Sequence, residues 1–468
     1  MTDTVSRAAQ EETAARLETL AIALANEEVT SRALVEKCLS RIENPDGEGS
    51  RAFLKLFARQ ARAQAELADQ MRLSGMLPSR FLGIPISVKD LFDLEGDITT
   101  AGSRVLQSAA PAGADALAIA RLRRAGFILI GRTNMTEFAF SGLGLNPHYG
   151  TPLAPWDRDN GRIPGGSSSG AAVSVADGMA HAAIGTDTGG SCRIPAAFCG
   201  IVGYKPTVGT VPADGIVPLS HTLDSAGPLA AGVSCCATLH ALMATGEAPA
   251  PPGGGAGDVA GLRIGVPQTV VLDDMDETVA RDFDAALVAL SEAGAYVVET
   301  PMEPFGRIAE INSKGGFAAA EAYAWHQEMM ARDETAYDPR VSSRIARGAS
   351  QSAADYIALL AARRRLITDF EAEASGFDLL AFPTVPTIPP LLAPLEADDA
   401  LYANINLLML RNSTTLNMVD GCAVSLPVHV PGAAPVGLTL AAARGDDSRL
   451  LRWALAVERV MENHRRAG

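Results

Sequence analysis

Residues 180–200 read AHAAIGTDTGGSCRIPAAFCG, an apolar run followed by a pair of glycines, a serine and a short helix-like segment. Successive glycines let backbone N–H groups turn toward one point, which is how an oxyanion hole is built. Thr188, Gly189 and Gly190 would supply those donors beside the Ser191 hydroxyl. Taken alone, the motif fits a tight turn with an incidental serine equally well.

A second serine site lies 24 positions earlier, at Ser167, in PGGSSSGAAVSVADG (164–178). This stretch predicts a glycine–serine loop that leads into an alanine-rich helix. It lacks both G-K-[ST] and G-x-G-x-x-G, so it does not indicate a phosphate site. Residues 166–170 match the nucleophile elbow G-x-S-x-G, which needs a preceding strand. The preceding APWDRDNGRIPG is rich in turn residues, so we interpret this match as accidental.

Lys89 ends the predicted strand FLGIPISVKD (81–90). A side chain at a strand end of an α/β sheet points into the crevice where ligands bind. A solvated lysine is the plainer interpretation of this residue alone. Its neighbours are apolar, however, and burial would lower its pKa far enough to make the amine a base.

The order of predicted elements indicates an α/β protein. An amphipathic helix at 116–126 and a buried strand at 127–133 follow the Lys89 strand, which is the βαβ pattern of a sheet covered by helices. The first seventy-odd residues are helical by pattern, with Thr30 as an N-cap. Further strands and helices are expected at 262–267, 276–294, 295–301, 378–384, 423–428, 436–442 and 447–464.

The low-complexity segment EAPAPPGGGAGD (247–258) predicts a flexible connector. Strands are expected on both sides of it, so a surface loop inside one large domain is favoured over a domain boundary. We therefore expect an N-terminal helical segment at 1–75 that packs on an α/β domain at 76–468.

Composition excludes several classes of function. The 468 residues are 47% hydrophobic and 20% charged, and the net charge is −15. This acidic balance argues against nucleic acid or an anionic membrane as the main partner. The six cysteines show neither C-x-x-C nor zinc spacing, and the N-terminus has no secretory pattern. A reduced, cytoplasmic enzyme without a metal is expected.

The sequence shows no motif for a histidine that would activate a serine. All seven histidines are scattered, and none lies in a Ser-His-Asp context. A triad assembled only by the fold stays open, because partners in a triad need not be neighbours in sequence. Cys192 adjoins Ser191 and is an alternative nucleophile, but no histidine or asparagine motif accompanies it.

Several motifs together resemble the amidase signature family, whose hydrolases use a Ser–cis-Ser–Lys triad. They are GIPISVKD, GRTNMTEFAFSG, PGGSSSG, GTDTGGSCRIPAAFCGIVGYKPT and LDSAGP within about 83–228, and the later PVGLTL. They occur in the family's order. The departures are Ala154, where an asparagine is commoner, and a helix start with fewer glycines than many members have. Neither touches the triad positions.

The resemblance implies both a fold and roles for residues. The fold is a single large α/β domain with a central mixed β-sheet covered by helices on both faces. Ser191 is then similar to the family's nucleophile, Ser167 to the bridging serine with a cis peptide before it, and Lys89 to the terminal base. Phe140 and Ser141 would form part of the pocket wall. Asp187, Ser168 and Arg193 would brace the loops.

The implied reaction is acyl transfer from a small amide, aryl amide or carbamate to Ser191, followed by hydrolysis, with no metal or cofactor. An alternative is the A subunit of a glutamyl-tRNA(Gln) amidotransferase. The motif with which that subunit usually binds glutamine is not found in 411–422, however. An inactive scaffold is disfavoured by the intact triad residues. Substrate choice is expected to depend on loops at 305–375 and 385–420, and apolar residues at 401–412 indicate an apolar site or core packing. A homodimer is a reasonable expectation.

Overall fold

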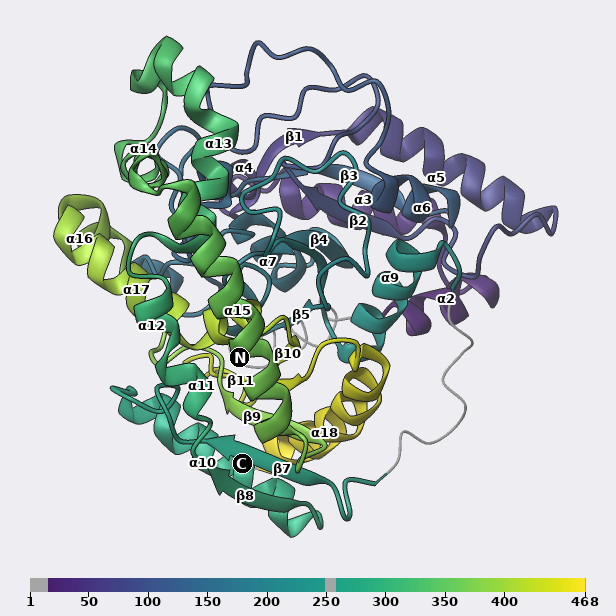
Figure 1. Cartoon of the computed structure of the whole chain (residues 1–468). Helices are drawn as coiled ribbons and strands as arrows, with labels where there is room; N and C mark the ends of the chain where they lie inside the picture. The colour runs from purple at the N-terminus through teal and green to yellow at the C-terminus, as the bar shows by residue number, and fades with distance from the viewer. Residues whose placement is uncertain (1–15, 249–257, 468) are drawn as a thin grey trace.

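An eleven-stranded mixed β-sheet organises the chain in this computed structural model, which describes residues 16–248 and 258–467. The strand order is β1-β3-β2-β4-β6-β5-β10-β11-β9-β7-β8. Figure 1 shows the sheet running from β1 at the top of the view to β7 and β8 at the bottom. The strands are β1 (Phe53–Leu56), β2 (Pro85–Lys89), β3 (Ile128–Thr133), β4 (Ala182–Asp187), β5 (Val202–Lys205), β6 (Ser225–Ala230), β7 (Arg263–Pro267), β8 (Tyr296–Thr300), β9 (Leu379–Pro383), β10 (Cys422–Pro427) and β11 (Gly437–Ala442).

Helices connect and cover these strands. The α-helices of the described residues are α2 (Leu17–Ala25), α3 (Ser31–Ile42), α4 (Gly49–Ala52), α5 (Ala58–Leu73), α6 (Leu117–Arg124), α7 (Ser169–Ala176), α8 (Arg193–Cys199), α9 (Val233–Thr245), α10 (Glu277–Glu292), α11 (Glu303–Gly306), α12 (Ile308–Ile311), α13 (Gly316–Asp333), α14 (Pro339–Ala346), α15 (Ala353–Ala374), α16 (Leu392–Ala397), α17 (Asp399–Met418) and α18 (Asp447–Ala467). Short 3-10 turns are η1 (Glu137–Ala139), η2 (Arg158–Asn160), η3 (Glu334–Ala336) and η4 (Arg347–Ser350). The expected single α/β domain with a mixed sheet is confirmed.

Both faces of the sheet are buried, because successive side chains of a strand point to opposite faces. Along β4, Ala182 and Ile184 belong to the hydrophobic cluster that contains α6, α9, α10 and α18. Ala183 between them belongs to the cluster of α3, α5 and α7 on the other face. Toward the far edge, α11, α13 and α15 pack on that second face through Leu380 and Phe382 of β9. Strands buried on both sides explain why β2, β3 and β4 read as nearly continuous apolar runs.

The parallel and antiparallel pairings decide where the site lies. β2 is parallel to both β3 and β4, so the carboxyl ends of these three strands meet at one edge. β4 pairs antiparallel with β6, in a register that places Asp187 opposite Ser225. Ligands of open α/β sheets bind outside the carboxyl ends of parallel strands. Strand β2, which ends at Lys89, and strand β4, which ends four residues before Ser191, therefore end side by side.

The N-terminal part of the described chain is mostly helical, as its pattern predicts. Thr30 caps α3, with its side chain accepting a hydrogen bond from the N–H of Ala33. One short element was not indicated by the pattern: Phe53–Leu56 forms β1 at the edge of the sheet, antiparallel to β3. The boundary between 75 and 76 stays a prediction, and most of the connector predicted at 247–258 lies outside the described residues.

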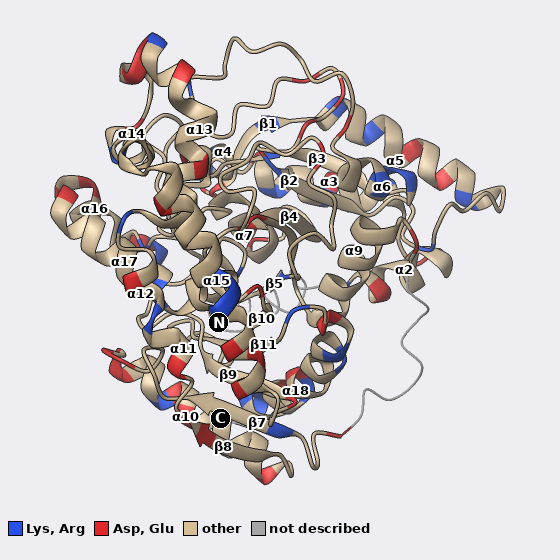
Figure 2. Ribbon diagram, viewed as in Figure 1, with Lys and Arg blue, Asp and Glu red and all other residues tan. Residues whose placement is uncertain are grey.

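The surface carries charges of both signs. Along α5, basic and acidic residues are interspersed on the outward side of the helix (Figure 2). In the described part of the chain, no helix combines the length and the apolar character needed to span a bilayer.

Candidate active site

Lys89 is fully buried at the carboxyl end of β2. Its Nζ donates to Ser167 Oγ at 2.7 Å and to Thr186 Oγ1 at 2.9 Å. Burial lowers the pKa of this amine to about 8, and the nearby acidic groups only partly oppose that effect. Since no carboxylate lies within ion-pair distance of Nζ among the described residues, a neutral amine is accessible near physiological pH.

Ser167 is held in a loop with an unusual backbone. The Gly166–Ser167 peptide bond is cis, as the family resemblance implies. The carbonyl of Ser167 accepts from the N–H of Thr136 at 3.1 Å, and the N–H of Gly166 donates to Gly142 at 2.8 Å. A Cβ on Gly166 would lie only 2.5 Å from the backbone nitrogen of Gly144, so this close approach requires glycine. Among the described elements, no strand leads directly into the loop, which supports treating the G-x-S-x-G match as accidental.

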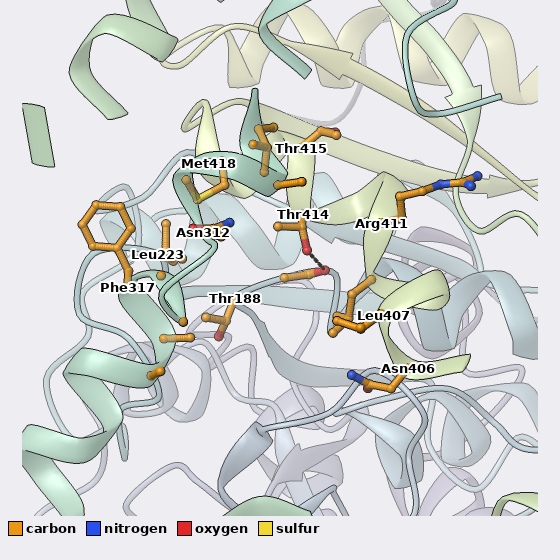
Figure 3. Close-up of a pocket in the computed structure, with 18 of the residues that line it drawn as sticks. Thr188, Leu223, Asn312, Phe317, Asn406, Leu407, Arg411, Thr414, Thr415 and Met418 are labelled. Atoms are coloured by element: carbon orange, nitrogen blue, oxygen red, sulfur yellow. Dashed lines mark hydrogen bonds between the residues drawn. The ribbon is translucent and has the colours of Figure 1, made fainter. Parts of the chain in front are cut away.

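Ser191 lies in the turn between β4 and α8, and helix α17 holds that turn in place. Gly190 has a φ of +129°, and a Cβ there would lie 2.1 Å from Ser413 Oγ. The carbonyl of Gly189 accepts hydrogen bonds from Ser413 Oγ at 2.7 Å and from Thr414 Oγ1 at 3.4 Å, the second of which is drawn in Figure 3. The turn conformation thus depends on glycine and on a helix more than 200 residues away in sequence.

A buried ion pair supports the same turn. Asp187 accepts from Arg193 Nε at 3.0 Å and from an Arg193 Nη at 2.9 Å, and both side chains are inaccessible to solvent. The carboxylate also accepts from the N–H groups of Gly190 and Cys192 and from Asn417. Burial alone raises the pKa of Asp187, but the Arg193 guanidinium and these hydrogen bonds outweigh it and hold the pKa well below its usual range.

Removing this carboxylate should destabilise the protein strongly. In an Asp187→Ala variant, Arg193 is left buried without its counter-charge, so we expect a loss of about 3–5 kcal/mol in the free energy of unfolding. Urea denaturation followed by circular dichroism measures it. Asp369→Ala is the matched control, because it removes the exposed Arg307–Asp369 pair. That pair should contribute about 1 kcal/mol or less, and equal losses in the two variants would contradict the bracing role.

Thr188 is tied to a second acidic group. Its Oγ1 donates to Asp224 Oδ1 at 2.5 Å, and the other carboxylate oxygen accepts from the N–H groups of Leu219 and Ser220. Burial raises the pKa of Asp224 to about 6, against the lowering effect of these hydrogen bonds. Asp224 therefore fixes the Thr188 side chain and orients the first peptide of the predicted oxyanion hole.

A cavity of about 530 Å³ opens beside Ser191. Phe140 and Ser141 line it, as expected from the sequence, and so do Thr188 and Gly189 of the predicted oxyanion hole, but not Gly190. Lys89 and Ser167 are fully buried and do not line it. Figure 3 shows the labelled side chains arranged around this space. The other lining residues are mostly apolar and include Leu219, Leu223, Phe305, Ile308, Phe317, Leu407, Leu410 and Met418.

Most of this lining comes from segments that the motifs do not cover. Residues 305–375 and 385–420 were expected to be loops that set substrate choice, and they do line the cavity. They are largely helical, however, because α11 to α15 and α16 to α17 occupy them. The apolar 401–412 stretch contributes Leu407 and Leu410 to the lining, while Met409 on the same helix is buried in the core. The interpretation as an apolar site therefore holds for Leu407 and Leu410, and the interpretation as core packing holds for Met409.

Cys192, the alternative nucleophile, is not among the residues that line the cavity. Cys192 is fully buried, and burial raises the pKa of its thiol above the usual range. His326 and His429 are buried as well and His181 is half-buried, and desolvation lowers each of their pKa values to about 4. In the part of the chain that the structure describes, no histidine lines the cavity, and no cluster of side chains is placed to hold a metal ion.

Comparison with known proteins agrees with this geometry. The family model described as Amidase matches residues 33–451. The chain belongs to the amidase family. It is 36% identical over 443 residues to a 2-amino-5-chloromuconic acid deaminase from Comamonas testosteroni, with 94% of each chain covered. It is also 36% identical over 479 residues to the A subunit of the glutamyl-tRNA(Gln) amidotransferase of Chloroflexus aggregans, with 95% of this chain and 96% of that one covered.

The fold comparison gives the same result. A crystal structure of an amidase superposes with a TM-score of 0.85 at 30% sequence identity, covering 95% of this chain and 99% of that one. Together with the family match, this identifies the protein as an amidase-family hydrolase of carbon–nitrogen bonds.

Proposed function

We propose that this amidase-family enzyme cleaves the C–N bond of a small amide, aryl amide or carbamate through an acyl-enzyme on Ser191. The observation that carries the proposal is the pairing of a buried, low-pKa Lys89 with Ser167 at 2.7 Å, in a loop whose next residue, Ser168, donates its N–H to the carbonyl of the cavity-lining Ser191 at 3.3 Å. A neutral amine hydrogen-bonded to a hydroxyl is the arrangement needed to pass a proton away from a second hydroxyl.

The first half of the reaction forms the ester. Ser191 Oγ attacks the substrate carbonyl carbon while its proton passes to Ser167, whose own proton passes to Lys89 Nζ. A C–O bond forms and the carbonyl electron pair moves onto oxygen. When the tetrahedral intermediate collapses, the C–N bond breaks, and the leaving nitrogen takes the proton returned through Ser167. Water then attacks the acyl-enzyme carbonyl carbon and gives a proton to the same relay. The C–O bond to Ser191 breaks, the relay returns the proton to Ser191 Oγ, and the carboxylic or carbamic acid is released.

The oxyanion would be held by backbone N–H groups of the turn between Thr188 and Ser191. The N–H of Gly190 already donates to Asp187 Oδ1 at 2.9 Å. We therefore assign most of the oxyanion binding to the N–H groups of Thr188, Gly189 and Ser191. Phe140 and Ser141, which line the same cavity, would contact the substrate.

The similarity to the amidotransferase A subunit supports a second candidate function, that of a glutaminase that works only with partner subunits. Both candidates use the same catalytic groups, so the assay must separate activity of the chain alone from dependence on a partner.

The test is product release by the purified chain, with primary amides, anilides and carbamates as substrates and Ser191→Ala as control. Release of ammonia or amine that depends on Ser191 supports a self-sufficient amidase. Hydroxylamine added during turnover should give a hydroxamate, because it captures the acyl-enzyme. A folded chain whose Ser191 reacts with a fluorophosphonate but which hydrolyses nothing would support the partner-dependent glutaminase. Turnover without Ser191 would overturn both.

A further inference from the structure

The charge of the cavity is opposite to that of the protein. The chain has a net charge of −15, yet the charged residues among the described lining are three arginines, Arg344, Arg347 and Arg411, and none is acidic. The rest of the lining is mainly apolar. Guanidinium groups in an otherwise apolar, concave site are typical of sites that bind an anion.

Arg344 differs from Arg411 in having no counter-charge. It is half-buried on α14, and no carboxylate in the described residues lies within ion-pair distance of it. It donates one hydrogen bond to the carbonyl of Phe140 and lies 5.6 Å from the ring centre of Tyr402. A guanidinium has five N–H donors, so this contact leaves most of them available to a ligand.

The two acidic residues near Arg344, Asp338 and Glu137, accept hydrogen bonds from other groups. Asp338 exerts an attraction on Arg344, but its Oδ1 accepts the N–H of Arg340 as the N-cap of α14. Glu137 accepts from Ser103, His148 and the N–H of Asp338. These contacts fix the start of α14 against the segment that carries Phe140, and so hold the Arg344 guanidinium at the cavity.

The other two arginines are less suited to hold a ligand inside the cavity. Figure 3 shows the Arg411 side chain pointing away from the other labelled residues. Its guanidinium donates to the carbonyl of Asp273 and lies 4.0 Å from the Asp274 carboxylate. Arg347 is exposed to solvent. Of the three arginines in the lining, Arg344 is therefore the one best placed to bind an anionic group inside the cavity.

We propose that the substrate of this site is an amide that also carries a carboxylate, and that Arg344 binds this carboxylate while the apolar lining contacts the carbon skeleton. The inference rests on the proposed function and narrows its substrate class. A carboxylate is the group that a guanidinium fork matches in geometry and charge. Binding it would orient the amide carbonyl toward Ser191.

Matched substrate pairs test the proposal. Each pair is a monoamide of a four- to eight-carbon dicarboxylic acid and the corresponding diamide, which differ only in the charged end. We expect the wild type to prefer the acid of the best-fitting length by about 10- to 100-fold in kcat/KM, the size of a charge-assisted hydrogen bond. Arg344→Gln should remove most of this preference, mainly through KM, and Arg344→Lys should restore part of it.

Arg340→Gln is the matched control. Arg340 lies one turn earlier on the same helix and pairs with Asp399, outside the cavity lining. This variant should keep the preference for the acid. A wild type that hydrolyses diamides at least as well as the acids, or an Arg344→Gln variant with the wild-type ratio, would overturn the carboxylate assignment and leave the proposed amidase function standing.

A binding measurement makes the inference independent of turnover. Ser191→Ala protein should bind the best-fitting monoamide of the four- to eight-carbon series more tightly than the corresponding diamide by calorimetry, and the added Arg344→Gln change should abolish the difference. If no substrate is hydrolysed but this difference is found, the proposed function fails and the anion site stands. If neither acid nor diamide binds, the carboxylate assignment is wrong.

Discussion

Replacing Ser191 with alanine should lower kcat/KM for every substrate by a factor on the order of 10⁴ to 10⁶, the loss seen when a covalent nucleophile is removed from a serine hydrolase. The side chain is small, 3% exposed and at the wall of the cavity, so its replacement leaves the fold intact. Rates of ammonia or amine release, with unfolding curves for both proteins, give the result.

Ser169→Ala provides a matched control for that variant. Ser169 is a buried serine only two positions after Ser167, and its Oγ has no hydrogen-bond partner among the described residues. Loss of this hydroxyl should therefore leave activity close to that of the wild type. A fluorophosphonate should label wild type and Ser169→Ala but not Ser191→Ala. Retention of more than a few per cent of activity in Ser191→Ala would show that another group is the nucleophile.

The sequence predicted the parts of the site that lie on short, local motifs. Lys89 ends a strand, and Ser191 follows a glycine pair that closes another strand. The topology of parallel β2 and β4 then brings these two strand ends to one edge. Each step depends on residues that are neighbours in sequence, or on the general rule that parallel strands present their carboxyl ends together. Ser167 lies on neither strand, and its place in the site was expected only from the family resemblance.

The cavity wall could not be predicted in the same way. Arg344 and Asn406 line the cavity from α14 and α17, more than 150 residues after Ser191. In sequence, Arg344 is indistinguishable from Arg340, which forms a surface ion pair on the same helix. Only the packing of α14 against the Phe140 segment decides which arginine faces the cavity. The short strand β1 was missed for a related reason, because its four residues pair with a strand more than 70 positions away.

Lys89→Met should lower kcat/KM by a factor on the order of 10² to 10⁴, the usual contribution of a general base, and should also change the pH profile. In the wild type the proton relay needs a neutral amine, and the pKa of Lys89 is about 8. We therefore expect kcat/KM to rise about tenfold per pH unit below pH 8 and to level off above it. The residual activity of Lys89→Met should lack this rise. A wild-type rate that falls from pH 6 to 9 at constant stability would contradict the role of Lys89.

The same amine links stability to pH, and the sign follows from its depressed pKa. An unfolded chain has Lys89 at its ordinary pKa of 10.5, whereas in the folded chain the pKa is about 8. Between these values the unfolded state binds more protons, so Lys89 makes stability rise as pH increases from about 8 to 10.5. A shift of this size corresponds to roughly 3 kcal/mol. Subtracting the unfolding curves of Lys89→Met from those of the wild type isolates this contribution from that of other titrating groups. A difference that stays constant across the window would show that the amine is not neutral in the folded enzyme, and the relay through Ser167 would then lack its base.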